Sequence, residues 1–198
     1  TPETPLERGF HQVIINKSWP VVLITDSTEA PNIQATIPAE SRYLYEARIE
    51  GSNESSLLAE YYAVVMPLQN SLVEAQTALR SLANEQKSEA NKALKMLIAD
   101  LDKTSLTFIK ENEGHPATLA ALEQLNIEKH SAAYKSVLKS LATSFSDSDY
   151  YVMLKKKYDA STTARTIPNQ PPPKKKSNRK NGQYAAGDEA LDIVMADP

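Results

Sequence analysis

Histidines and closely spaced carboxylates are the residues of this chain best suited to catalysis or metal binding. His11, His115 and His130 lack the short spacing of metal-ligand motifs, and no cysteine is present to complete a zinc site. We interpret His115, which precedes a proline, as a loop or cap residue. His130 lies in a polar stretch, so we expect its side chain to be exposed to solvent. The histidines therefore predict no metal site.

The carboxylate pairs and the glycines do not form an enzyme motif either. Asp100 and Asp102, like Glu111 and Glu113, are two residues apart in helix-forming sequence, so the members of each pair point to different faces. The glycines are dispersed and form neither a dinucleotide loop nor a phosphate-binding loop. We therefore expect a non-enzymatic protein with no catalytic residue and no cofactor.

The C-terminal part of the chain separates charges of opposite sign. Nine Lys or Arg lie between residues 155 and 180 with one acid, whereas residues 181–198 contain four acids and no base. Because the whole chain has a formal charge of −3, residues 1–154 carry −7. An acidic body, a basic arm and a terminal peptide indicate a binding protein rather than an enzyme.

The basic arm has three interpretations. Residues 171–180 resemble a nuclear localisation signal, with residues 155–157 as a second basic cluster. The same side chains would neutralise phosphates in salt-dependent, sequence-independent nucleic-acid binding, or would form a solvated linker. We favour contact with nucleic acid or another polyanion. The candidate residues are Lys155, Lys156, Lys157, Arg165, Lys174, Lys175, Lys176, Arg179 and Lys180.

The acidic terminal peptide carries apolar residues of its own. Leu191, Val194 and Met195 have helical spacing, and the same segment with Ile193 would also suit an added strand. We expect Leu191, Ile193, Val194 and Met195 to dock on a protein partner or a neighbouring subunit.

The N-terminal quarter has the pattern of β-strands. Residues 11–15 and 21–25 are rich in β-branched side chains, and apolar residues alternate in 33–37 and 43–50. These runs predict a small antiparallel sheet of three or four strands.

The period then changes to that of helices. Leu58, Val65, Leu72 and Leu79 are spaced by seven, and residues 68–113 contain no Gly or Pro over 46 positions. We expect these apolar residues to form core rather than to serve self-association. Since one helix of this length would be unusual, we expect an antiparallel, coiled-coil-like hairpin.

Several helix boundaries can also be placed. Pro67 predicts a kink or a helix start, and the hairpin turn should lie near Asn84, near Asn91 or at residues 102–105. Gly114-His115-Pro116 ends one helix and starts the next. Two further amphipathic helices and a short last helix are expected before a linker that begins beyond Tyr158.

The fold class is therefore α+β and predominantly α, with a small N-terminal antiparallel sheet, a multi-helix bundle and an extended tail. We divide the chain into an N-terminal arm (1–9), a β region (10–54), a helical bundle (55–158) and a tail (159–198). No apolar run is long enough for membrane insertion, and no classical signal peptide is apparent, so we expect an intracellular or particle location, including the nucleus.

These features favour a structural or assembly protein of a larger complex, for example a virion or nucleoprotein component. It would contact a protein partner or form a homo-oligomer through its bundle, and would contact nucleic acid through its arm. The alternative is a nucleic-acid-processing accessory factor or nuclear adaptor.

Overall fold

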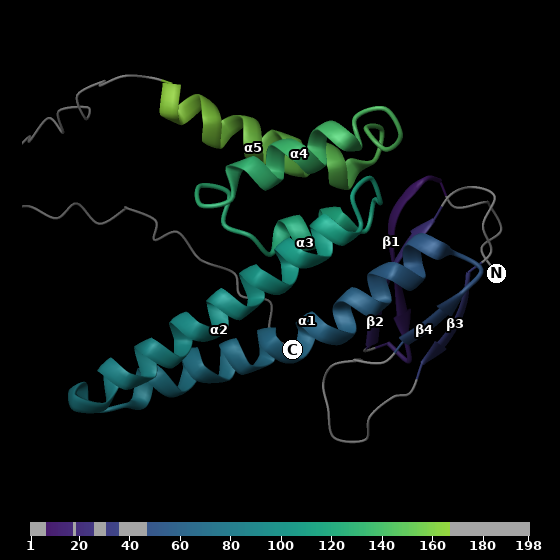
Figure 1. Ribbon diagram of the computed structural model, residues 1–198. Helices are drawn as coiled ribbons and strands as arrows, with labels where there is room; N and C mark the ends of the chain where they lie inside the picture. Colours follow the sequence, from purple (N-terminus) through teal and green to yellow (C-terminus); the bar gives the residue numbers. More distant parts are fainter. Residues whose placement is uncertain (1–6, 18, 26–30, 36–46, 167–198) are drawn as a thin grey trace, which may run out of the picture. The chain divides into compact units, whose positions relative to one another are not determined.

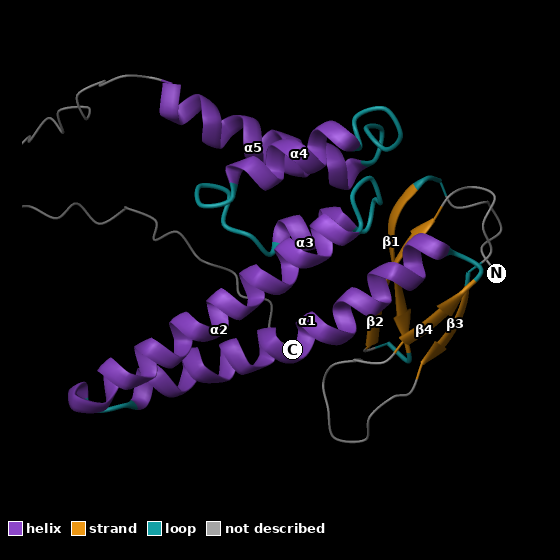
Figure 2. Ribbon diagram, in the orientation of Figure 1, coloured by secondary structure: helices purple, strands orange, loops and turns teal. Residues whose placement is uncertain are grey.

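The computed structural model describes residues 7–17, 19–25, 31–35 and 47–166 of the chain. Helices predominate, and short strands precede them, as the sequence predicts (Figure 2). The strands are β1 (Gly9–Ile15), β2 (Trp19–Thr25), β3 (Asn32–Ala35) and β4 (Ala47–Glu50). The helices are α1 (Asn53–Ser81), α2 (Asn84–Glu111), α3 (Thr118–Glu123), α4 (Ser131–Ser140) and α5 (Asp149–Thr166).

The strands form two antiparallel pairs rather than one sheet of three or four strands. β1 pairs with β2 from Gly9↔Thr25 to Ile15↔Trp19, and β3 pairs separately with β4. The β1–β2 turn contains two non-glycine residues with positive φ, Asn16 at 50° and Lys17 at 62°. Apolar side chains of both pairs meet in a small cluster, so packing joins the strand pairs that hydrogen bonding leaves separate.

Two buried serines fasten α1 to strand β2. Ser52 caps α1, and its Oγ accepts the Ser55 N–H at 3.3 Å. The Ser55 hydroxyl accepts the Ile24 N–H at 2.9 Å and donates to the Ile24 carbonyl at 2.7 Å. These bonds satisfy backbone groups of β2 that would otherwise be buried without partners.

Helices α1 and α2 form the predicted antiparallel hairpin (Figure 1). The connection lies at Leu82 and Ala83, next to the first of the predicted turn positions. Pro67 lies inside α1, so the helix does not start there. Leu58 and Val65 are buried in the core. Between Met66 and Asp100, in contrast, no side chain that the structure describes is buried.

The main core lies where the base of the hairpin meets the shorter helices. Its side chains come from β2 and from all five helices. The largest fully buried apolar members are Ile24, Leu58, Val65, Leu119, Leu122, Leu141 and Leu154.

The helix boundaries that follow the hairpin agree with the sequence predictions, except at the end of α5. α2 ends at Glu111 and α3 begins at Thr118, around the predicted stop at residues 114–116, where Gly114 has a φ of 87°. The last helix was expected to be short, but α5 continues to Thr166. Residues 159–166, predicted as the start of an extended tail, are therefore helical.

Candidate nucleic-acid interface on α4 and α5

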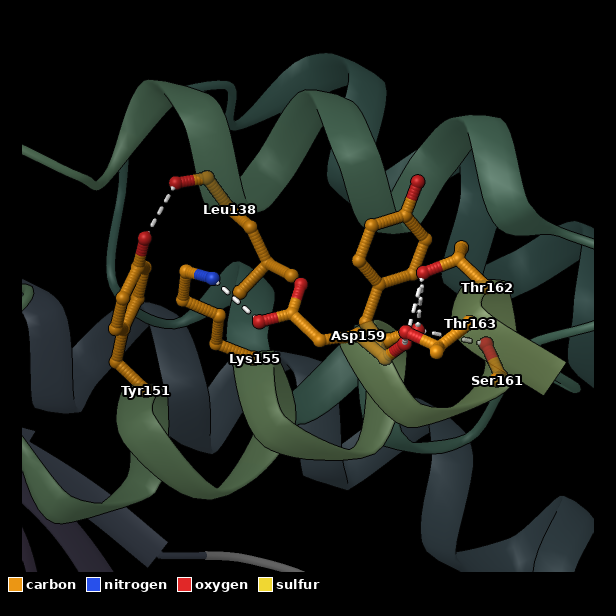
Figure 3. Close-up of polar contacts among 8 residues, drawn as sticks. Leu138, Tyr151, Lys155, Asp159, Ser161, Thr162 and Thr163 are labelled. Atoms are coloured by element: carbon orange, nitrogen blue, oxygen red, sulfur yellow. Dashed lines mark hydrogen bonds and ion pairs between the residues drawn. The ribbon is translucent and has the colours of Figure 1, made fainter. Parts of the chain in front are cut away.

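Helix α5, which carries the first basic cluster, is fixed to α4 by two tyrosines. The buried Tyr151 donates its hydroxyl proton to the Leu138 carbonyl at 2.9 Å (Figure 3). The ring of Tyr158 stacks on that of Tyr134, with centroids 6.0 Å apart and planes within 5°. The cluster from residue 155 to 157 is therefore presented by a packed helix.

The three consecutive lysines of α5 have different environments. Lys155 Nζ lies 2.5 Å from Asp159 Oδ2, and the hydrogen bond to this carboxylate raises the pKa of Lys155 (Figure 3). Lys157 Nζ lies 3.6 Å from Glu123 Oε1, which links α5 to the end of α3. Lys156 is exposed and has no ion pair among the residues that the structure describes. Contact with a phosphate would therefore break no ion pair of Lys156, whereas it would compete with the ion pairs of Lys155 and Lys157.

Hydroxyl side chains occupy the part of α5 that follows Tyr158. Ser161 Oγ donates to the Tyr158 carbonyl at 2.8 Å, and Thr163 Oγ1 donates to the Asp159 carbonyl at 2.8 Å (Figure 3). Thr162 Oγ1 reaches both carbonyls, at 3.2 and 2.9 Å. Such hydroxyls often compete with helix formation, but here they find partners along the helix itself.

A shallow hollow of about 520 Å³ lies between α5 and the segment that follows α4. Ala142 and the exposed Val152 line it, together with Lys155 and Lys156. The Ala142 N–H donates to the Lys139 carbonyl at 3.4 Å, so the helical turn continues and Lys139 lies on the same side of α4 as Ala142, although the lysines that line the hollow itself are Lys155 and Lys156.

Lys135 lies one helical turn before Lys139 on the same face of α4, and both side chains are exposed. We name these four residues the α4–α5 lysine face: Lys135 and Lys139 lie on the Ala142 side of α4, and Lys155 and Lys156 line the hollow.

The structure covers only part of the predicted site. Lys155, Lys156 and Lys157 lie on α5, and Arg165 lies in its last turn, where its side chain is outside the description. The remaining basic candidates, Lys174, Lys175, Lys176, Arg179 and Lys180, and the docking candidates, Leu191, Ile193, Val194 and Met195, lie outside the described residues.

Sequence reasoning missed Lys135 and Lys139. Their spacing of four residues in a helix was the available signal, but only the packing of α4 against α5 relates them to the later cluster.

The histidines outside this site serve as structural links. His115 lies in the α2–α3 connection, as expected, and its Nδ1 is 2.8 Å from Glu54 Oε1. The prediction for His130 was wrong: its side chain is 13% exposed and its Nε2 lies 3.1 Å from Asp102 Oδ2. Asp102 is buried, whereas Asp100 is exposed, so this carboxylate pair does not converge.

The described residues contain no group of three or more His, Asp or Glu side chains that could hold a metal ion. Among the same residues, no helix is both long enough and apolar enough to cross a bilayer. Models of known protein families, curated protein sequences and solved structures give no significant match to this chain.

Proposed function

We propose that this protein is a non-enzymatic structural or assembly component of a larger complex, such as a virion or nucleoprotein particle. Its helical bundle makes protein contacts, and its α4–α5 lysine face contacts the phosphate backbone of nucleic acid. The basic residues 174–180 extend this contact along the chain, and the terminal peptide 188–198 docks on a neighbour.

The α4–α5 lysine face is the observation that carries the nucleic-acid part of this proposal. Lys155 and Lys156 line one hollow together with Asp159, and Lys135 and Lys139 are exposed on the side of α4 that carries Ala142, another residue of that hollow. A rigid face of this kind positions several ammonium groups without the entropy cost of ordering a free arm. Contacts of this type follow the backbone and carry no sequence information, so we expect binding without strong sequence preference.

Salt dependence tests the face quantitatively. Each phosphate neutralised on duplex DNA adds about 0.9 to the slope of log K against log salt concentration. The double substitution Lys135→Gln with Lys139→Gln should therefore reduce the slope by about 1.8, as measured by fluorescence anisotropy with a labelled duplex. These two lysines are chosen because neither has an ion pair among the described residues, so their loss leaves the fold unchanged.

The matched control is Lys95→Gln with Lys110→Gln, which removes the same charge from exposed positions of α2. It should leave the slope nearly unchanged. If both double variants reduce the slope equally, binding depends on net charge alone, and the α4–α5 lysine face is refuted as the binding site. A third variant neutralises all five basic residues from 174 to 180; if this variant and the face variant both bind like the unmodified chain, nucleic-acid contact is refuted.

A further inference from the structure

An exposed serine, Ser146, lies in the segment between α4 and α5. Acids follow it at the next position and at the third, where the sequence has Asp147 and Asp149. No other Ser or Thr of the chain has acids at both of these positions. Acid-directed serine/threonine kinases recognise this pattern, because their substrate groove is basic and reads charges that follow the hydroxyl residue.

The neighbouring serines differ from Ser146 in exposure or in surroundings. Ser148 is buried, with 3% of the residue exposed, so a kinase cannot reach it in the folded chain. Ser144 is exposed and has an acid at the third position, but the position that follows it holds the buried Phe145. Ser144 also lines a different hollow, together with Arg8. Ser144 is therefore a matched control for Ser146.

Ser146 lines the same hollow as two residues of the α4–α5 lysine face, Lys155 and Lys156. The Cα–Cβ bonds of a helix tilt toward its N-terminus, so the Lys156 side chain leaves α5 in the direction of the segment that contains Ser146. Lys156 is exposed and has no ion pair among the residues that the structure describes, whereas Lys155 pairs with Asp159 (Figure 3). The hollow therefore offers a phosphate one unpaired ammonium group and a second one that it would share with Asp159.

The start of α5 also favours a negative group at this place. The Ser148 carbonyl accepts the Val152 N–H at 3.0 Å, so the helix opens two residues after Ser146. The helix macrodipole stabilises negative charge near this end, and a phosphoserine carries about −1.5 to −2 charges at pH 7. Asp147 and Asp149 repel a phosphate, so the lysines of the hollow must supply most of the attraction.

We propose that Ser146 is a phosphorylation site of an acid-directed serine/threonine kinase, and that its phosphate group pairs with Lys155 and Lys156 in the hollow. In this modification the Ser146 Oγ attacks the γ-phosphorus of ATP, the bond from that phosphorus to the leaving oxygen of ADP breaks, and the hydroxyl proton passes to the catalytic base of the kinase. The pairing withdraws both lysines from nucleic acid. This last consequence rests on the proposed function, whereas the modification site and its pairing do not.

Phosphorylation reverses the sign of the charge around the hollow. Two bases and one acid, Lys155, Lys156 and Asp159, give its lining a formal charge of +1, and the phosphate adds about −1.5 to −2. Two contacts of the lysine face with DNA phosphates are lost, so the slope of log K against log salt concentration should decrease by about 1.8. At about 0.15 M salt this decrease corresponds to a loss of about 30-fold in affinity for duplex DNA.

Treatment of the full chain with casein kinase II and MgATP tests the site. Mass spectrometry of proteolytic fragments should find a phosphate group on Ser146. The variant Ser146→Ala should lose this modification, and the matched variant Ser144→Ala should keep it. Absence of phosphate from Ser146, or modification of Ser144 to the same extent, would overturn the proposal.

Phosphorus NMR tests the pairing in a chain that receives phosphoserine at position 146 during translation. The charged residues on the elements around the hollow are Lys135, Lys139, Asp147, Asp149, Lys155, Lys156 and Asp159. Ammonium groups favour the dianion, so the second pKa of the phosphate should rise when Lys155→Gln and Lys156→Gln remove two of them. The control Lys95→Gln with Lys110→Gln removes the same charge from α2 and should leave that pKa unchanged. Equal values in the two double variants would overturn the pairing.

Fluorescence anisotropy with a labelled duplex separates this inference from the proposed function. The phosphorylated chain should bind about 30-fold more weakly than the unmodified chain. If it binds equally well while Lys135→Gln with Lys139→Gln reduces the salt slope, the regulation is rejected and the proposed function stands. If the phosphate pairs with the lysines but neither change weakens binding, the nucleic-acid contact is rejected and the modification site stands.

Discussion

Asp102 is the buried charge whose removal gives the clearest test of how α2 is joined to the rest of the domain. Its Oδ2 accepts hydrogen bonds from Lys129 Nζ at 2.6 Å and from His130 Nε2 at 3.1 Å. The Asp102 side chain is 11% exposed, whereas that of Lys129 is 61% exposed. Burial raises the pKa of Asp102, but the hydrogen bonds and positive charges of the two partners outweigh burial and hold it below its usual value.

The substitution Asp102→Asn keeps the size of the side chain and removes its charge. The ion pair with Lys129 should contribute less than about 1 kcal/mol to the free energy of unfolding, because water screens the Lys129 ammonium group. The share from His130 should be about 1–2 kcal/mol, since its ring is buried beside the carboxylate. We therefore expect the free energy of unfolding to fall by about 2 kcal/mol at pH 7, which lowers Tm by about 4–8 °C for a domain of this size.

The lowered pKa of Asp102 determines in which direction its stabilising effect changes with pH. A carboxylate whose folded pKa lies below its unfolded value stabilises the fold above the unfolded pKa of about 3.9. That stabilisation is lost as the pH falls through the folded pKa. The difference between the unmodified protein and Asp102→Asn should therefore be present above about pH 4 and shrink below it.

Urea unfolding followed by circular dichroism measures these quantities at each pH. Asp100→Asn is the control, since Asp100 is exposed, and it should change stability by less than about 0.5 kcal/mol. If Asp102→Asn costs no more than this control, or if its cost is unchanged at pH 2.5, the charge of Asp102 does not hold α2 in place.

Two further predictions concern buried hydroxyl groups. Ser55→Ala should cost about 1–3 kcal/mol in urea unfolding, because the buried Ile24 N–H loses its Ser55 acceptor and the Ile24 carbonyl keeps only the Ser52 hydroxyl, whereas Ser88→Ala at an exposed position of α2 should be nearly neutral; equal costs would mean that the α1–β2 link is not important for stability. Burial, with a smaller effect of the Glu123 charge, raises the pKa of Tyr62 and of Tyr134 to about 12. The unfolded chain ionises its tyrosines near pH 10, so stability should fall as the pH rises from about 10 to 12, and absorbance at 295 nm should show a late titrating group; complete titration by pH 11 in the folded state would contradict this.

The helical hairpin shows what the sequence could and could not predict about the fold. A heptad period is local information, so Leu58, Val65, Leu72 and Leu79 were correctly placed on one face. The local sequence pattern does not reveal how many other elements cover that face, because this depends on long-range packing. Leu58 and Val65 are buried, but Leu72 and Leu79 are half-buried, because the other core elements reach only the base of the hairpin. The division of the strands into two pairs was missed for the same reason, since alternation predicts a strand but not its neighbour.

The candidate site shows how folding redistributes charges that look equivalent in the sequence. Lys155 and Lys157 belong to the basic run of the sequence, yet both meet acids of the folded domain. Lys135 and Lys139 form no basic run in the sequence because uncharged residues separate them, yet they lie on the same side of α4 as Ala142, which lines the hollow with Lys156. The number of phosphates that the folded domain can neutralise therefore depends on which lysines lack an acid within reach, and not on the length of the basic run. A salt-slope measurement on the face variant reads that number directly.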